Sequence, residues 1–173
     1  MHRFPTSAAD VPDGDEFQAI THPPAAVVVL SSAETDLLAL ARVIQRRPPS
    51  WSPRGVPLAS LSHPALIDHY ISASLGTTRV VVVRLLGGRG HWSYGLERLR
   101  HWRQQEPGRH LLLLAGTAEE DEVLASLSSV PEPLTLALAE CFRVGGPANL
   151  ALVLHCLEAL LEGTIPPPPF PLQ

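Results

Sequence analysis

Lysine is absent from the sequence, and all 13 of its basic residues are arginines. A P-loop needs a lysine that reaches the phosphates of a nucleotide, and Schiff-base chemistry needs a lysine amine. The sequence therefore contains neither a Walker A motif nor a Schiff-base nucleophile. The nucleophile motif G-x-S-x-G is also missing, so the sequence shows no complete catalytic set.

Cysteine is scarce, and metal-ligand spacings are equally hard to find. The two cysteines, Cys141 and Cys156, show no C-x-x-C spacing, and we expect both to be buried thiols. The sequence has eight histidines but no H-x-x-x-H pair. His63 and His69 would point to different faces of a helix, so we expect no metal site within this chain.

No apolar run approaches the length that spans a bilayer, and the net charge of −4 gives no general attraction to nucleic acid or to an anionic membrane. Residues 1–24 are acidic and lack the apolar core of a signal peptide. We therefore expect a cytoplasmic protein with no nucleic-acid or membrane partner.

Short valine- and leucine-rich runs alternate with helical patterns along the chain. We expect strands at 25–30, 55–61, 79–86 and 110–116, each followed by a helix, and two further helices after Pro131. Ser31 and Glu34 have the spacing of a capping box for the first helix. This alternation predicts an α/β fold: a flavodoxin-like three-layer domain with a four-stranded parallel sheet in the order 2-1-3-4 and extra C-terminal helices.

The expected domain covers residues 25–163. Residues 1–24 carry acidic and small residues without a periodic pattern, and we expect them to form a mobile leader. The proline-rich residues 164–173 are expected to form an extended tail that leads to a body missing from this chain.

The segment GGRGHWSYG (87–95) joins the third strand to its helix, and at the predicted strand order it lies where ligands of such sheets gather. It resembles a dinucleotide fingerprint, but it follows the third strand, lacks the final glycine, and has no acidic residue near 110. Two interpretations remain open. The glycines and the helix N-terminus could cradle a carboxylate or phosphate, or the glycines could simply permit a tight turn.

The aromatic residues near this segment divide by helical position. Trp92, Leu96, Leu99 and Trp102 share one helix face, which predicts that Trp92 is part of the core. His91 and Tyr94 lie off that face. The candidate substrate-binding residues are therefore Arg84, Gly87, Gly88, Arg89, Gly90, His91 and Tyr94, with the two arginines paired to carboxylates.

Several motifs in the same order resemble a known family. They are VVVLSSAETDLLALA, LASLSHPALIDHYI, VVVVRLLGGRGHWSYGLERLR, FRVGGPANLALVLHCLEALLEG and the closing PPPPFP, which together span about residues 25–170. They look like the N-terminal region of the large subunit of aerobic, ATP-dependent cobaltochelatase, the CobN type, which is related to the magnesium chelatase large subunit. Ser93 stands where the resemblance leads us to expect proline, and both residues suit a helix start.

The resemblance implies a part in a ligase reaction that inserts cobalt into hydrogenobyrinic acid a,c-diamide during cobalamin biosynthesis. Cobalt and ATP would be used by the whole complex, with neither bound by this chain alone. The implied partners are the rest of the large subunit, AAA+-type motor subunits and the corrinoid substrate. No catalytic residue can be assigned here, and the domain would bind or enclose the corrinoid or support assembly. The alternative is a stand-alone flavodoxin-like module that binds a nucleotide or a partner.

Overall fold

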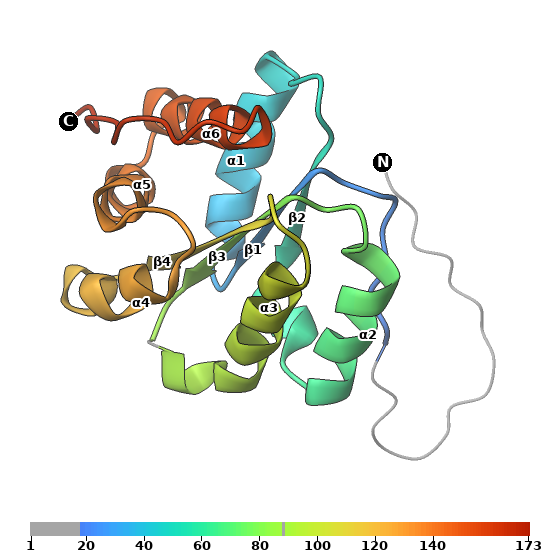
Figure 1. Cartoon of the computed structure of the whole chain (residues 1–173). Helices are drawn as coiled ribbons and strands as arrows, with labels where there is room; N and C mark the ends of the chain where they lie inside the picture. Colours follow the sequence, from blue (N-terminus) through green and yellow to red (C-terminus); the bar gives the residue numbers. More distant parts are fainter. Residues whose placement is uncertain (1–17, 88) are drawn as a thin grey trace.

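Four parallel strands form one sheet in the order β2-β1-β3-β4. The computed structural model describes residues 18–87 and 89–173, apart from the side chains of Arg89, Glu120 and Asp121. The strands are β1 (Val27–Ser31), β2 (Pro53–Pro57), β3 (Val80–Leu85) and β4 (His110–Ala115). Helices lie on both faces of this sheet and make a three-layer domain (Figure 1). The expected fold class and strand order are confirmed.

The two helical layers differ in where they come from along the chain. One face is covered by α2 (Pro64–Ser74) and α3 (Ser93–Gln105), and the other by α1 (Glu34–Arg46), α5 (Glu132–Val144) and α6 (Pro147–Leu161). The short helix α4 (Asp121–Leu127) packs beside β4 and α5. Three 3-10 turns complete the order: η1 (Leu58–Leu61), η2 (Arg89–His91) and η3 (Ala118–Glu120).

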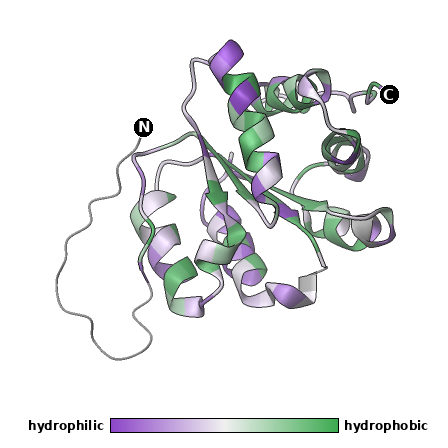
Figure 2. Cartoon of the chain, turned by 180° about the vertical axis from the view of Figure 1, so that it is seen from behind, coloured by the Kyte–Doolittle hydropathy of each residue, from purple (hydrophilic) through white to green (hydrophobic). Residues whose placement is uncertain are grey.

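The central strands β1 and β3 are buried along their whole length, and they are apolar except for Ser31 and Arg84 near their carboxyl ends, as expected where both faces of a sheet are covered. Along β3, Val81, Val83 and Leu85 pack against α2 and α3, whereas Val80 and Val82 pack against the opposite layer. Figure 2 shows hydrophobic strands in the middle of the domain and hydrophilic residues on the outer helices. No helix among the described residues is long and apolar enough to cross a membrane.

The two sheet edges are finished in different ways. At β4, the Ser128 and Ser129 hydroxyls accept hydrogen bonds from the amides of Leu113 and Leu111 at 2.9 and 2.8 Å, so the open edge is capped. The expected strand at 55–61 is wrong in its bounds, because β2 ends at Pro57 and residues 58–61 form η1. Proline has no amide hydrogen for the ladder, which explains the early end.

The expected capping box of α1 is also not formed. Ala33 is the N-cap of α1 and makes no side-chain cap bond. Ser31 instead ends β1, and its hydroxyl accepts from the Ala33 amide at 3.0 Å and donates to Asp36 at 3.1 Å. The expected leader lies largely outside the described residues, but His22 within its described part makes a 2.6 Å hydrogen bond to the Tyr70 hydroxyl.

The proline-rich tail runs back along α6 (Figure 1). The buried Asn149 side chain fixes it, because its amide nitrogen donates to the Leu172 carbonyl at 2.8 Å and its oxygen accepts from the Leu172 amide at 2.7 Å. The domain limits predicted at 24 and 163 stay a prediction.

Candidate functional site

The carboxyl ends of β1 and β3 lie side by side, and the turns that follow them are hydrogen-bonded to each other. The Ser32 amide donates to the Arg84 carbonyl at 3.0 Å, and the Leu86 amide donates to the Ser32 hydroxyl at 3.2 Å. Crossover connections leave β1 and β3 toward opposite faces of the sheet, which is the place where ligands bind in open parallel sheets. The candidate site is therefore built around the 86–94 turn.

Arg84 has partners different from the expected substrate carboxylates. Its Nε donates to Asp36 Oδ2 at 2.7 Å, and its Nη1 donates to the Ala115 carbonyl at 3.0 Å. The guanidinium also lies over the Phe142 ring, 5.2 Å from its centroid. The Arg84 side chain is buried and already paired with Asp36, so it connects the start of α1 to the end of β3. It is therefore not exposed for contact with a substrate carboxylate.

Gly87 has a backbone conformation that requires glycine. Its φ is +87°, and a Cβ would approach the His91 ring to 3.0 Å. This geometry brings His91 back over the start of the turn, with the side chain exposed. Gly90 is exposed with open space around it, whereas Gly88 and the Arg89 side chain lie outside the described residues.

Trp92 is part of the core, as its helical position predicts. Only 6% of its surface is exposed, and its indole Nε1 donates to the Leu61 carbonyl at 2.9 Å. The ring occupies the space where a Cβ of Gly95 would lie, so glycine at this position lets α3 begin directly over the tryptophan. The 86–94 turn is therefore anchored by a buried, hydrogen-bonded tryptophan.

Tyr94 lies at the surface and joins α3 to α2. Its hydroxyl donates to Asp68 Oδ2 at 2.6 Å, and Arg98 Nε donates to Asp68 Oδ1 at 2.9 Å. The hydrogen bond to the Asp68 carboxylate raises the pKa of the Tyr94 phenol, since ionisation would break it. The phenol is thus oriented as a protonated group, with 41% of the residue exposed.

A small cavity of about 120 Å³ opens beside this turn. Its wall combines the end of η1 with the start of α3, and it includes Leu61, Ser62, Gly90, His91 and Tyr94. Small-molecule pockets measure about 300–1,000 Å³, so this cavity suits one chemical group rather than a whole macrocycle. Within the part of the chain that the structure describes, no group of three or more His, Cys, Asp or Glu residues could hold a metal ion.

The structure thus brings Gly87, Gly90, His91 and Tyr94 together and separates Arg84 from them. Sequence reasoning missed Asp68 and Arg98, because the contacts of Asp68 with Tyr94 and Arg98 cross 26 and 30 positions of the chain. It also missed Asp36, whose partner Arg84 is 48 positions away. No periodic pattern links such pairs.

No family model matches the sequence. Two curated relatives match it. The aerobic cobaltochelatase subunit CobN of a Sinorhizobium species is 31% identical over 98% of this chain. The CobN subunit of Pseudomonas aeruginosa is 28% identical over 94% of this chain. The chain spans 13% of the length of each relative.

A solved structure also shares the fold. The catalytic subunit of cobaltochelatase from Mycobacterium tuberculosis aligns with 87% of this chain and 12% of its own, with a TM-score of 0.61 and 22% identity. Both curated relatives match nearly from end to end of this chain and carry the same name. Over almost its whole length, the chain is therefore similar to part of the CobN subunit of aerobic cobaltochelatase, and these matches support an N-terminal CobN region.

Proposed function

We propose that this chain contributes to the ATP-dependent insertion of cobalt into hydrogenobyrinic acid a,c-diamide, a ligase reaction of cobalamin biosynthesis. The observation that carries the proposal is the 31% identity to a CobN subunit over 98% of the chain. The chain spans 13% of the length of that relative. In this proposal, the residues that carry out metal insertion therefore lie in the remaining part of the large subunit.

The domain's own contribution is binding without bond making. In this proposal, the 86–94 turn forms part of the wall against which the corrinoid rests. Tyr94 offers a protonated phenol that Asp68 orients, and His91 offers an imidazole held by the Gly87 turn. The neighbouring cavity of about 120 Å³ accepts one peripheral side chain of the corrinoid. Gly88 and Arg89 complete the expected set, with Arg89 as the partner of a substrate carboxylate.

The same surface supports a second role, which is assembly. Leu86 and Tyr94 are 42% and 41% exposed on one turn, and exposed large apolar and aromatic side chains are typical of protein interfaces. In this alternative the turn packs against the rest of the large subunit or against AAA+-type motor subunits that hydrolyse ATP. Both roles place the chain in the cytoplasm, in a complex that uses cobalt and ATP as substrates.

One experiment separates these roles. Cobalt insertion is measured with the assembled chelatase that contains this chain, as a function of corrinoid concentration, for Tyr94→Ala and Leu86→Ser. A substrate contact predicts a raised KM for the corrinoid with normal assembly, whereas an assembly contact predicts weaker complex formation in gel filtration. Leu38→Ser, which changes a 60% exposed leucine on α1, is the matched control. If both turn variants behave like this control, the 86–94 turn has neither role.

A further inference from the structure

A larger cavity lies at the opposite end of the sheet from the 86–94 turn. It measures about 330 Å³ and lies between α6 and the 47–52 segment, which joins the end of α1 to the start of β2. Its volume falls within the range of about 300–1,000 Å³ that is typical of small-molecule pockets. Its apolar lining comes from Val43, Pro48, Pro49, Trp51, Ala151 and Leu154.

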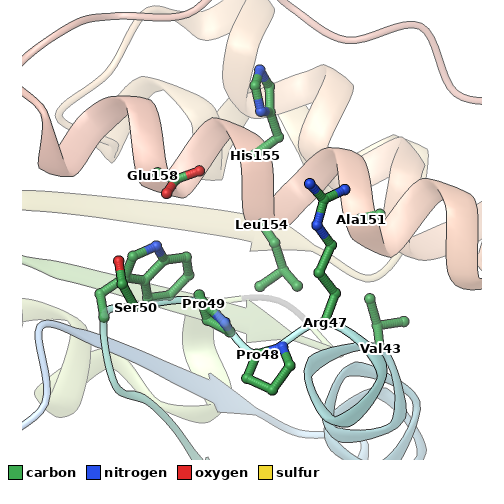
Figure 3. Close-up of a pocket in the computed structure, with 10 residues that line it drawn as sticks. Val43, Arg47, Pro48, Pro49, Ser50, Ala151, Leu154, His155 and Glu158 are labelled. Atoms are coloured by element: carbon green, nitrogen blue, oxygen red, sulfur yellow. The ribbon is translucent and has the colours of Figure 1, made fainter.

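Two opposite charges lie at the rim of this cavity without pairing. Arg47 at the end of α1 and Glu158 on α6 both line it, and among the described residues neither side chain makes a hydrogen bond or an ion pair. Figure 3 shows the guanidinium and the carboxylate on either side of Leu154. His155 stands one helical turn before Glu158 on the same wall. We did not predict a role for this His-x-x-Glu spacing from the sequence.

The tryptophan in the wall is also incompletely satisfied. The indole nitrogen of Trp51 is buried and finds no hydrogen-bond partner among the residues that the structure describes. The other two tryptophans differ, because Trp92 and Trp102 each donate to a backbone carbonyl, at 2.9 and 3.0 Å. Buried donors are nearly always bonded, so this unpaired donor distinguishes the tryptophan in the cavity wall from the other two.

From these features we propose that the cavity binds an apolar α-amino acid. The ligand carboxylate pairs with Arg47, its ammonium group pairs with Glu158, and its side chain packs on Trp51 and Leu154. A ligand with a single charge would leave one of the two rim residues unpaired and would be repelled by the like charge. A zwitterion satisfies both at once. This site is independent of the proposed part in cobalt insertion.

The binding test uses the full chain and nuclear magnetic resonance. The indole N–H signals are followed during titration with L-leucine, L-valine, L-methionine and L-phenylalanine, and Trp51→Phe identifies the Trp51 signal. We expect at least one amino acid to shift that signal and to leave those of Trp92 and Trp102 unchanged. For leucine, the matched probes are 4-methylpentanoate, which lacks the amine, and 3-methylbutylamine, which lacks the carboxylate. Each should bind about tenfold or more weakly, the expected effect of losing one charged hydrogen bond.

Matched variants test the two charged residues. Arg47→Gln and Glu158→Gln should each weaken amino-acid binding about tenfold, because each leaves one end of the zwitterion unpaired. Arg46→Gln and Glu162→Gln remove neighbouring exposed charges that do not line the cavity, and they should bind normally. Three results would overturn the proposal: no shift of the Trp51 signal with any amino acid, equal affinity for either single-charge probe, or unchanged binding by both cavity variants.

Discussion

Arg84 and Asp36 form an ion pair at the carboxyl end of the sheet, with 2.7 Å between Nε and Oδ2 and side-chain exposures of 7% and 16%. The pair joins β3 to the first turn of α1. Asp36 also accepts a hydrogen bond from Ser31 at 3.1 Å, so both strand ends are tied to one carboxylate.

Removing the arginine should therefore destabilise the fold. Arg84→Met leaves the mostly buried Asp36 without its cation, and breaking a buried pair from one side costs about 3–5 kcal/mol. Urea unfolding measures this loss, and Arg84→Met with Asp36→Leu should recover much of it. Arg98→Met is the control, because the Arg98–Asp68 pair is 41% and 42% exposed, and exposed pairs contribute about 0–1 kcal/mol. Equal losses for Arg84→Met and Arg98→Met would contradict the structural role of Arg84.

Gly95 should tolerate no side chain. The Trp92 ring fills the position of its Cβ, so Gly95→Ala must displace a ring that is only 6% exposed. Overpacking of this kind costs about 1–3 kcal/mol, measured as a loss in the free energy of unfolding. Gly76→Ala is the matched control, since apart from its chain neighbours no heavy atom of the described residues lies within 4 Å of its Cβ position. A Gly95→Ala protein as stable as the control would show that the tryptophan does not support the turn.

The two tyrosines should titrate at alkaline pH for different reasons. Burial raises the pKa of Tyr70, whereas the hydrogen bond to Asp68 raises that of Tyr94. Asp68→Asn should lower the pKa of Tyr94 toward its ordinary value of 10.0 and leave Tyr70 unchanged. Since the folded-state pKa is raised, the Tyr94–Asp68 bond stabilises the fold below pH 10 and is lost as the phenol ionises above it. Absorbance titration measures the pKa values of both tyrosines, and Tyr94→Phe assigns the two steps. An unchanged pKa of Tyr94 in Asp68→Asn would contradict the hydrogen bond between Tyr94 and Asp68.

The cysteines should be unreactive in the folded protein. Burial raises the pKa of the Cys156 thiol from 9.0 to about 11, and burial also raises that of Cys141. At pH 8 a thiol reagent should therefore modify both residues only after unfolding, because the thiolate is the nucleophile. Because the unfolded thiol ionises first, Cys156 contributes stability below pH 9 that is lost as pH rises toward 11. Rapid modification without denaturant would contradict the buried positions.

The features that could be predicted from the sequence are those that depend on local patterns. The alternation of valine-rich runs with helical patterns predicted a parallel, flavodoxin-like sheet in the order 2-1-3-4, and the four-residue step from Trp92 to Leu96 predicted that the tryptophan lies in the core. Contacts between distant residues could not be predicted, because nothing in the spacing of Asp68 and Tyr94, or of Asp36 and Arg84, signals that they meet. Arg84 shows the consequence: its residue type suits a carboxylate ligand, but the carboxylate it binds belongs to Asp36.

The part that we propose for this chain in cobalt insertion can be tested directly. The most direct measurement is the rate of Co²⁺ incorporation into hydrogenobyrinic acid a,c-diamide, with ATP, by the assembled chelatase with this chain present and with it omitted. We expect that omission lowers the rate and that adding the purified chain restores it. An equal rate with and without the chain would show that the chain has no part in cobalt insertion.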